Sequence, residues 1–503
     1  MNQKTTWPPQ PWNQPHKQMI ESQTWWEGNL QKLTNNYRHN PQNHPNQYKG
    51  GIVGTATRLW LGKPTGTGDN NDKIHIPLPA DIARLSANQL FSNPPKITLS
   101  AAENNPTAQQ RIDQILNTQA FAANLLVAAE LCSVHGGIYG RIVYNQNIQQ
   151  EPWIDWVPAT QAIPQFQYGQ LTKVTFHTTL DTDNQHTLRH LETYGPGYIE
   201  HALYEGKPDE LGRRIPLTEN EALAPLAELL DENARIATGY GRSAAAYIPN
   251  AKPNIGFIGN GQLGNLGRSD LSLDLFPMFD KLDMVYSSLM RDVRLGRARI
   301  VADESLLDDR GPGRGAAFDL DREVFTKVSG SPDETIMQAH QFAIRVDEHI
   351  KIIEDLSQRI MRRVGYSPLS FGLVDDGAMT ATEVRARTRM TESTTRAKSR
   401  YWSTGLSQLA DAALGIDAAL NHTGVTIDHK LTVEIQPPIE ESQLERAQTI
   451  QALDSARAIS TATRVAAVNP TWEQSKVEEE TQAILREQGI LMESIFDTPD
   501  EVE

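Results

Sequence analysis

The chain has 503 residues, of which 39% are hydrophobic and 22% are charged, as in an ordinary soluble globular protein. This length predicts two to four domains with a sizeable buried core. The formal net charge of −15 disfavours a protein that grips nucleic acid over a broad surface, because contacts from Lys and Arg to phosphate supply most of that affinity. A protein that DNA slides past without sticking is compatible with this charge.

Cysteine content and hydropathy exclude further classes. Cys132 is the only cysteine, so neither an intrachain disulfide nor a cysteine-based zinc site can form. Its apolar helical surroundings predict a small buried side chain. Residues Met1–Gln18 lack the apolar core of a signal peptide, and the most apolar run, Phe121–Val134, is too short to span a bilayer. We therefore expect a protein that is made and assembled in the cytosol.

The first third of the chain predicts an arm followed by two helices. Residues 1–70 are rich in Trp, Asn, Gln and Pro and show little periodicity, apart from a short helical patch near Met19–Leu33. Prolines bracket a first helix within residues 76–97. A second helix is predicted over Thr107–His135, and Gly136–Gly137 ends it. The apolar side of the first helix comprises Ile82, Leu85, Ala87 and Leu90.

Several short runs after these helices predict β-strands. They are Ile138–Tyr144, Trp153–Val157, Lys173–Thr178, Arg189–Tyr194 and Tyr198–Tyr204. Gly195–Gly197 predicts a hairpin turn between the last two strands. Because consecutive strands follow one another without alternating helices, the sequence predicts an α+β fold.

Long helices dominate the pattern after Asp270. A helix is predicted over Leu275–Arg297, and residues 298–332 are irregular, with short strand candidates at Ala298–Ala302 and Val324–Val328. Residues Asp333–Val364 predict a helix of about 45 Å with one continuous apolar stripe. The stripe comprises Ala339, Ala343, Val346, Ile350, Ile353, Ile360 and Val364.

A loop and a further long helix follow. Gly365 ends the preceding helix, and residues Tyr366–Met379 predict a loop. Thr380–Glu383 is a capping box, in which the first and last side chains satisfy each other's backbone N–H groups. It therefore predicts the start of a helix, which the pattern carries to about Leu414.

The last part of the chain predicts one strand and a polar helical region. Leu431–Gln436 alternates like a strand and is closed by two prolines. From Glu440 the pattern is helical almost to the end, with a break at Asn469–Pro470.

One motif suggests an enzyme. Gly259, Gly261 and Gly264 match the fingerprint in which glycines let a dinucleotide pyrophosphate approach a helix N-terminus. Asp280 and Asp283 follow near the spacing of a ribose-binding carboxylate. However, no helix flows directly from the motif and no βαβ alternation follows, so a Gly-rich loop is the favoured interpretation. The alternative is an NAD(P)-dependent oxidoreductase, which a cofactor titration would test.

No other motif points to catalysis, so we expect no catalytic residue, no metal and no cofactor. A phosphate-binding loop, a paired-histidine metal motif and a nucleophile elbow are all missing from the sequence. A run of basic residues predicts either a solvated, salt-bridged helix face or a face that meets phosphate or the acids of a neighbouring subunit. The run comprises Arg385, Arg387, Arg389, Arg396, Lys398 and Arg400.

Several segments occur in a recognisable order across residues 70–440. They are Ile76–Ala87 with Phe91–Pro95, Gly136–Tyr144 with Pro158–Pro164, Tyr247–Asn250, Gly267–Leu271 with the helix containing Asp280, Asp283 and Ser287, and Ser367–Pro368 to Thr380–Glu383. In this order they resemble the portal proteins of long-tailed bacteriophages, of the siphovirus type found in actinobacterial phages. The tryptophan-rich start has no place in the resemblance; it carries Trp7, Trp12, Trp25 and Trp26.

The resemblance implies an α+β portal fold with an α/β wing, long stem helices, a small α/β clip, a tunnel loop, a kinked long helix and a C-terminal helical crown. The implied boundaries are 1–70 for the N-terminal arm, 71–270 for the first part of the wing, 271–297 for stem helix 1, 298–332 for the clip, 333–365 for stem helix 2, 366–379 for the tunnel loop, 380–439 for the long helix and return strand of the wing, and 440–503 for the crown and C-terminal tail.

The resemblance also implies a non-enzymatic function. Portal proteins of this type form a dodecameric ring at one capsid vertex of the virion, assembled in the host cytoplasm, and serve as the conduit for DNA packaging and ejection. The implied partners are double-stranded DNA without sequence specificity, the terminase large subunit, a head-completion or adaptor protein, and the major capsid and scaffolding proteins, with no membrane. A scaffold or minor head protein would not explain the order helix, irregular segment, helix, loop and helix over residues 275–414.

Three groups of residues are candidate sites under this resemblance. The tunnel loop is lined by Ser370, Phe371, Gly372, Leu373, Val374, Asp375, Asp376 and Gly377. The candidate residues for docking a partner at the clip are Asp308, Asp309, Arg310 and Arg314. The candidate residues for contacting DNA or a neighbouring subunit are Arg385, Arg387, Arg389, Arg396 and Lys398. The glycines and paired acids of the tunnel loop predict a mobile segment that does not hold phosphate.

Overall fold

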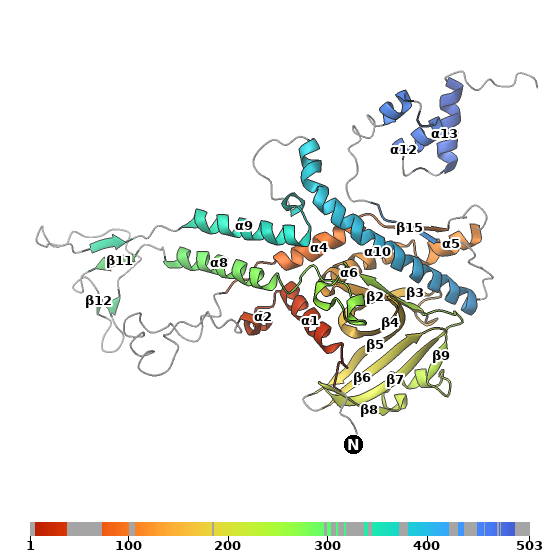
Figure 1. Ribbon diagram of the computed structural model, residues 1–503, viewed down its shortest axis with the longest axis horizontal. Helices are drawn as coiled ribbons and strands as arrows, with labels where there is room; N and C mark the ends of the chain where they lie inside the picture. The colour runs from red at the N-terminus through yellow and green to blue at the C-terminus, as the bar shows by residue number, and fades with distance from the viewer. Residues whose placement is uncertain are drawn as a thin grey trace, which may run out of the picture. The chain divides into compact units, whose positions relative to one another are not determined.

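A computed structural model gives the architecture of the chain (Figure 1). The chain divides into two compact units, Met1–Gln436 and Pro437–Glu503. Helices combine with antiparallel sheets, which confirms the predicted α+β class. The structure describes residues 6–37, 73–99, 106–183, 186–295, 299–302, 308–309, 316–317, 337–340, 345–371, 381–421, 431–436, 450–456, 458–469, 472 and 474–487.

Most described helices and strands belong to the first unit. Its helices are α1 (Asn13–Glu27), α2 (Leu30–Tyr37), α4 (Leu78–Phe91), α5 (Pro106–Ile115), α6 (Gln119–His135), α7 (Ala224–Ala227), α8 (Phe276–Leu295), α9 (Val346–Val364) and α10 (Ala381–Asn421). Its strands are β1 (Lys96–Leu99), β2 (Gly137–Val143), β3 (Trp153–Pro158), β4 (Ala162–Gln167), β5 (Gln170–Thr182), β6 (Thr187–Gly195), β7 (Tyr198–Lys207), β8 (Glu210–Ile215), β9 (Arg235–Ala237), β10 (Ala245–Pro249), β11 (Arg299–Ala302), β12 (Asp308–Asp309), β13 (Ala316–Ala317), β14 (Met337–His340) and β15 (Leu431–Glu434). Its short 3₁₀ turns are η5 (Ala159–Gln161), η6 (Leu217–Glu219), η7 (Ile255–Phe257), η8 (Leu263–Asn265) and η10 (Pro368–Phe371).

Two antiparallel sheets form the strand-rich part of this unit. Six strands make the larger sheet in the order β4-β5-β6-β7-β8, with β9 paired to β7. The smaller sheet has the order β10-β2-β3. All five predicted strands are present, as β2, β3, β5, β6 and β7. β5, β6 and β7 meander in chain order within the larger sheet, whereas β2 and β3 pair in the smaller sheet, where β2 also pairs with the later strand β10. β4, β8, β9 and β10 are additional, and their short or polar sequences carry little alternation.

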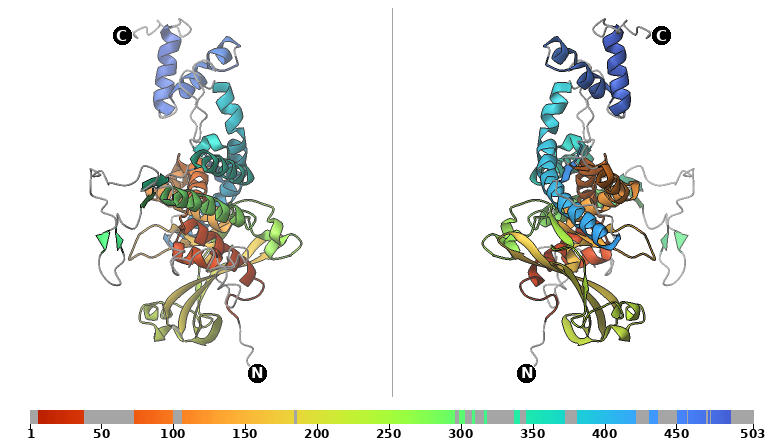
Figure 2. Two further views of the ribbon diagram at one scale, coloured as in Figure 1. Left: turned by 90° about the vertical axis from the view of Figure 1, so that its left-hand side faces the viewer. Right: turned by 90° about the vertical axis from the view of Figure 1, so that its right-hand side faces the viewer.

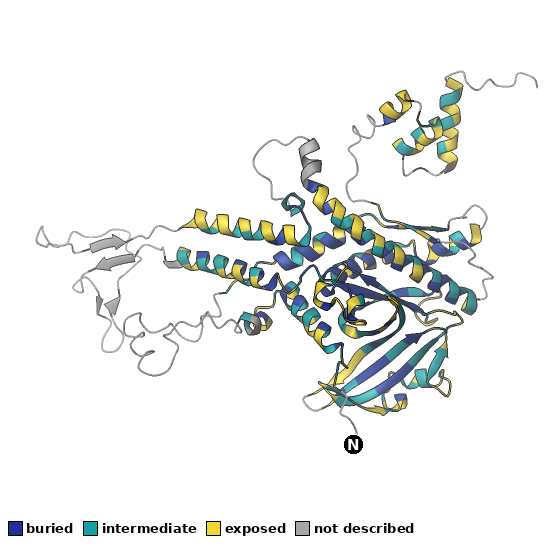
Figure 3. Ribbon diagram, in the orientation of Figure 1, coloured by how far each residue is buried: buried dark blue, intermediate teal, exposed yellow. Residues whose placement is uncertain are grey.

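Helices α6 and α10 cover the small sheet and enclose the main core. Leu125 of α6, Ile248 of β10 and Leu409 of α10 are fully buried there. Trp402 of α10 packs edge-on against Phe91, with ring centroids 4.9 Å apart. Figure 3 shows this interior as the dark centre of the unit. Burial of these aliphatic and aromatic side chains is the main favourable term in its stability.

The predicted helix over Thr107–His135 is wrong as a single element, since the structure has two helices. α5 ends at Ile115, and α6 starts after Thr118, whose side chain accepts a hydrogen bond from the backbone N–H of Phe121. This cap on the second helix fixes the break, and the two axes differ by 58°. Gly136 ends α6 in the left-handed conformation (φ 82°), as expected.

No single helix among the described residues is both long and apolar enough to cross a membrane. The bent pair α5–α6 meets the length and composition requirement only when its two helices are counted together.

The predicted helical patch near Met19–Leu33 is confirmed by α1 and α2, but the expectation of a loose arm is wrong for residues 6–37, which pack on the fold. Trp25 is 2% exposed and Trp12 is 9% exposed. Trp7 packs edge-on against His177 of β5, with ring centroids 5.0 Å apart. In Figure 1 and Figure 2, α1 lies between the six-stranded sheet and the pair α8–α9. The tryptophans are therefore internal anchors, a role that their polar, proline-rich surroundings conceal. Residues 38–72 lie outside the described part.

The predicted helix over Asp333–Val364 is wrong in its first half. Met337–His340 forms β14, which pairs antiparallel with β11, so that Ala339 faces Ile300 in the ladder. Helix α9 begins only at Val346. Strand pairing to a distant segment overrides the three-to-four spacing of alanines that suggested a helix. The strand candidate at Val324–Val328 lies outside the described residues.

The remaining elements follow the expected order. α8 matches the predicted helix closely, and α10 continues to Asn421, past the expected end at Leu414. The helix runs through Gly415, where a Cβ would lie 2.5 Å from the Tyr240 ring, so this glycine allows a close approach and does not end the helix. β15 pairs antiparallel with β1.

The second unit is described over α12 (Thr461–Val468), α13 (Gln474–Glu487) and a short preceding helix. Ser460 caps α12 by accepting a hydrogen bond from the backbone N–H of Thr463. α12 ends at Val468, which confirms the predicted break at Asn469–Pro470.

Candidate functional site

The candidate site is the region where α8, α9 and α10 meet around the start of the predicted tunnel loop. α8 and α9 run antiparallel and side by side (Figure 1). Arg363 Nε of α9 donates to Asp274 Oδ2 at 2.6 Å at one end. His349 Nε2 lies 3.2 Å from Asp292 Oδ2 toward the other end. Between these two contacts the helices bury an apolar seam, which contains Phe279, Leu282, Ile353, Leu356, Ile360 and Met361.

Asp283 fastens α8 to the extended segment that precedes α4. Its carboxylate is 1% exposed on the side chain and accepts hydrogen bonds from the Tyr37 hydroxyl at 2.5 Å and the backbone N–H of Ile76 at 2.9 Å. His75 Nδ1 lies 2.9 Å from the same carboxylate. Burial, with the charge of Asp283 beside it, raises the pKa of Tyr37 above its ordinary value, so this hydroxyl stays protonated and remains a donor. The contacts fix the position of α8 along its first half.

An aromatic cluster from the N-terminal helices supports the same half of α8. Trp25 stacks on Phe276 with ring centroids 6.1 Å apart, and Phe279 and Tyr37 lie within 5.7 Å of it. Lys73 Nζ lies 2.9 Å above the Tyr37 ring and 2.7 Å from Asp280 Oδ1. The polar and aromatic contacts together hold α8 against the body of the unit.

The junction from α9 to the loop is a tight helix end. Gly365 adopts φ 95°, and the backbone N–H groups of Gly365 and Tyr366 both donate to the carbonyl of Met361. The Thr394 hydroxyl of α10 donates to the Gly365 carbonyl at 2.7 Å. A Cβ on residue 365 would lie 2.6 Å from the Thr394 Oγ1, so both conformation and space require glycine here.

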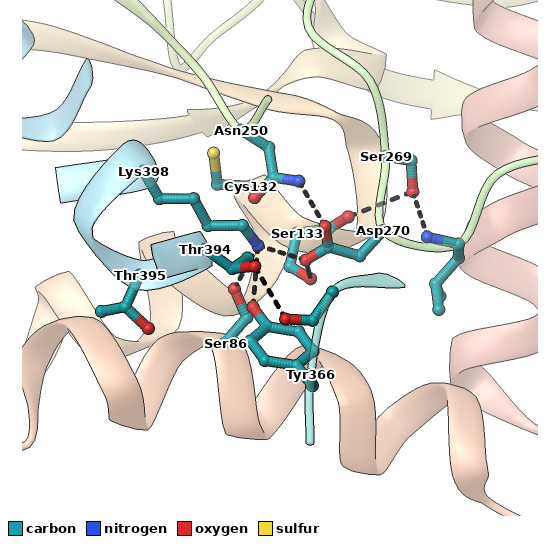
Figure 4. A network of polar contacts seen from close by, with 12 residues as sticks. Ser86, Cys132, Ser133, Asn250, Ser269, Asp270, Tyr366, Thr394, Thr395 and Lys398 are labelled. Carbon is teal, nitrogen blue, oxygen red and sulfur yellow. Dashed lines mark hydrogen bonds and ion pairs between the residues drawn. The ribbon is translucent and has the colours of Figure 1, made fainter. Parts of the chain in front are cut away.

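A buried ion pair ties this junction to the core (Figure 4). Lys398 Nζ of α10 donates to the carboxylate of Asp270, to Ser86 Oγ of α4 at 2.7 Å and to the Tyr366 hydroxyl at 3.0 Å. Lys398 is 3% exposed and Tyr366 is fully buried. Four elements therefore converge on one ammonium group.

Asp270 is satisfied on its other side. Ser133 Oγ donates to Asp270 Oδ2 at 2.6 Å, and Asn250 Nδ2 donates to Asp270 Oδ1 at 2.9 Å. Burial alone would lower the pKa of Lys398, but the charge of Asp270 and the Tyr366 hydroxyl raise it above its ordinary value. Lys398 is therefore protonated at neutral pH, and its position inside the network corrects the prediction that it contacts DNA or a neighbouring subunit.

The first residues of the predicted tunnel loop are held against α10. The backbone N–H of Ser367 donates to Thr391 Oγ1 at 2.9 Å, and the Ser370 and Thr391 hydroxyls are 2.8 Å apart. Ser370 and Phe371 belong to η10 and are half-buried. Gly372, Leu373, Val374, Asp375, Asp376 and Gly377 lie outside the described residues.

The predicted basic residues divide into two groups. Arg389 and Arg396 are exposed on α10. Lys398 lies on the buried side of the same helix. Arg385 and Arg387 lie on α10 where side chains are not described.

The predicted clip has two small antiparallel strand pairs, β11–β14 and β12–β13. Asp308 and Asp309 form β12 and pair with Ala317 and Ala316. Pairing of β11 with β14 carries the segment between the helices to His340, beyond the predicted clip end at residue 332. Arg310 and Arg314 lie outside the described residues.

The glycine motif does not form a dinucleotide site. Gly259 and Gly261 lie between the short turns η7 and η8, Gly264 lies within η8, and α8 starts only at Phe276. The preceding strand β10 belongs to an antiparallel sheet, so the βαβ unit that would aim a helix N-terminus at pyrophosphate is missing here. Among the described residues no group of His, Cys, Asp and Glu could hold a metal ion.

Asp270, Tyr366 and Ser86 were not predicted as partners of Lys398. A usable signal was present at Lys398, which falls where α10 turns from polar to apolar, whereas Asp270 has Arg268 two residues before it as an apparent local partner. Neither pattern identifies a partner that lies 128 residues away.

The family model described as "Phage portal protein, SPP1 Gp6-like" matches residues 16–489 of this chain. A search of curated proteins found no match. Among solved structures, a chain from the neck of an empty gene transfer agent particle computed with C6 symmetry is 13% identical, with a TM-score of 0.43, covering 80% of this chain and 92% of that chain.

Two further structures of gene transfer agent particles show similar values. A chain from the native virion is 12% identical, with a TM-score of 0.43, covering 83% of this chain and 99% of that chain. A chain from the native neck computed with C12 symmetry is 10% identical, with a TM-score of 0.40, covering 82% and 92%. The family match spans most of the sequence and agrees with the portal resemblance. This chain belongs to the SPP1 Gp6-like family of phage portal proteins, which are structural proteins of the phage particle and not enzymes.

Proposed function

We propose that this chain forms a closed dodecameric ring at one vertex of a phage capsid and is the conduit for DNA packaging and ejection. The observation that carries the proposal is the family match over residues 16–489. The order of the antiparallel pair α8–α9, a loop and the 41-residue helix α10 supports it. Assembly in the host cytoplasm and a siphovirus-type virion belong to the same proposal.

The conduit acts passively on double-stranded DNA, without sequence specificity. A charge of −15 per subunit, multiplied around a ring, repels phosphate and lets the duplex slide. Residues 366–379 are assigned as the tunnel loop of the narrowest part, and the contacts of Ser367, Ser370 and Tyr366 fix its start. Energy for movement comes from a separate ATPase, because this chain has no phosphate-binding loop.

Basic residues of α10 are proposed to contact phosphate or the acids of a neighbouring subunit. Arg389 and Arg396 are exposed, which supports this role. Arg385 and Arg387 precede them on the same helix and are assigned with them.

The clip is proposed as the docking platform for partner proteins. It connects the ends of α8 and α9, so any partner bound there would act directly on the helix pair. The proposed partners are the terminase large subunit and a head-completion or adaptor protein, which contact Asp308, Asp309, Arg310 and Arg314. The major capsid and scaffolding proteins bind elsewhere on the ring.

Imaging and a loop deletion test the proposal together. Negative-stain images with mass analysis should show rings with a central hole, about an order of magnitude heavier than the protomer. Deletion of Gly372 to Gly377 should leave ring assembly intact and impair packaging or DNA retention, because the fixed base of the loop is kept. A same-length Gly/Ser replacement serves as control for loop length. Normal packaging by the deletion variant would contradict the tunnel-loop assignment, and wild-type monomers at every concentration would contradict the ring.

A further inference from the structure

One side of α8 carries an exposed line that alternates charge and apolar surface. The exposed members are Lys281, Met284 and Arg291, with the half-buried Ser288 between the last two; the four recur at three-to-four-residue spacing, opposite the buried Phe279 and Leu282 on the helix. Met284 is 44% exposed. Among the described residues, Lys281 and Arg291 have no ion-pair partner, so two cations and one apolar side chain face outward unpaired.

One side of α9 carries a line of the opposite sign. Asp347, Ile350 and Glu354 are exposed at three-to-four-residue spacing, and Ile350 is 42% exposed. In the part of the chain that the structure describes, neither Asp347 nor Glu354 forms an ion pair. Figure 3 shows that much of α9 is exposed along its length.

The two lines lie at matching heights on the helix pair. Asp274 beside Arg363 and Asp292 beside His349 set the register between α8 and α9. Interpolating between these contacts brings each cation to within about one helical turn of an acid on α9, Lys281 with Glu354 and Arg291 with Asp347. At about 100° per residue on antiparallel helices, the two lines fall on opposite sides of the pair.

We infer that α8 of one copy of this chain packs against α9 of the next copy, with Lys281 and Arg291 facing Glu354 and Asp347 and with Met284 against Ile350. The inference rests on the proposed function, because rotation about a ring axis along the helices keeps residues at equal heights. Because the two complementary lines lie on different faces, the interface is heterologous, with one surface of each copy meeting a different surface of the next. Interfaces of this kind form rings when the rotation closes. The partner is therefore a second copy of the same chain, selected by charge and by exposed apolar area.

Charge exchange at this contact gives a direct test. In the full-length variants K281E/R291E and D347K/E354K, attraction becomes repulsion at two positions. Each variant should therefore raise the protomer concentration at which half of the chains are assembled by about tenfold or more. A tenfold change corresponds to about 1.4 kcal/mol. The quadruple variant K281E/R291E/D347K/E354K restores attraction with the signs exchanged, so it should assemble like the wild type. Sedimentation velocity over a concentration series at low salt measures all three. K207E/R213E, on the exposed β7–β8 hairpin, makes the same charge change away from the contact.

The outcomes separate this inference from the proposed ring. The inference would be overturned, and the ring kept, if neither charge reversal weakens the wild-type oligomer. The same holds if the quadruple variant is folded by circular dichroism but stays dissociated. If charge reversal does not weaken the oligomer, the exposed lines on α8 and α9 would bind a different protein. A wild type that never assembles would overturn the ring and the inference together.

Discussion

The buried pair Lys398–Asp270 permits a quantitative test of how the start of the tunnel loop is held. Replacing Lys398 by Met removes the ammonium and leaves a carboxylate that is 6% exposed without its counter-charge. Breaking a buried ion pair costs about 3–5 kcal/mol. Asp270 keeps hydrogen bonds from Ser133 and Asn250, so we expect a loss at the lower end, about 3 kcal/mol.

Thermal unfolding at fixed protein concentration measures this loss. For a unit that spans Met1–Gln436, the entropy of unfolding is about 0.9 kcal/mol per kelvin, so 3 kcal/mol lowers the Tm by about 3 °C. Hydrogen exchange should rise at the amides of Leu369 and Ser370, which depend on the segment that Tyr366 anchors.

The double variant D270N/K398M decides whether the two charges act as a pair. Removing both charges leaves no buried ion, so the double variant should be less destabilised than the sum of the single variants by about 2 kcal/mol. Additive losses within about 0.5 kcal/mol would refute the reasoning, because independent residues add in this way. The exposed pair Arg359–Asp355 gives the matched control, with a coupling of about 0.5 kcal/mol or less.

Two further predictions concern other buried groups. Asp283→Asn keeps only one acceptor oxygen, so it cannot accept from Tyr37 and His75 on one side and from the Ile76 N–H on the other. This change should cost about 2–3 kcal/mol and raise amide exchange at residues 73–76. Asp280→Asn, whose partner Lys73 is partly exposed, should cost under about 1 kcal/mol, and equal losses would contradict the anchoring role. Burial, with His16 nearby, lowers the pKa of His135 to about 4, so the unfolded chain binds more protons between that pKa and its unfolded value near 6.5. The free energy of unfolding should therefore fall by up to about 1.4 kcal/mol per pH unit as the pH drops through this window. His135→Gln should make the Tm fall less between pH 7 and pH 5. An unchanged dependence of Tm on pH would contradict this assignment to His135.

Elements defined by local chemistry were predictable from the sequence. The helix α8, the glycine that ends α9 and the break after Val468 depend on apolar periodicity, on Gly365 and on Asn469–Pro470. Their signals lie within a few residues of the element that they define. The meandering strands β5, β6 and β7 were predictable for the same reason, because hairpin neighbours follow directly in the chain.

Features that depend on distant partners were not predictable. β14 resembles a helix until its pairing with β11 is known. Trp25 sits in a polar, proline-rich stretch, and its burial depends on Phe276 and Phe279 about 250 residues later. Lys398 belongs to a basic run in the sequence, and only its contact with Asp270 separates it from Arg396. Placement of the candidate sites came from the family resemblance, since no local pattern marks a tunnel loop.

The pairing of β1 with β15 has a consequence for the order of synthesis. Lys96–Leu99 pairs with Leu431–Glu434, more than 300 residues later, and among the described strands these two pair only with each other. At about 5–20 residues per second, the ribosome needs on the order of 20–70 s to deliver the partner of β1. During that interval the apolar surface of Ile97 and Leu99 has no strand to cover it, so folding of the first unit can finish only when nearly the whole chain has emerged.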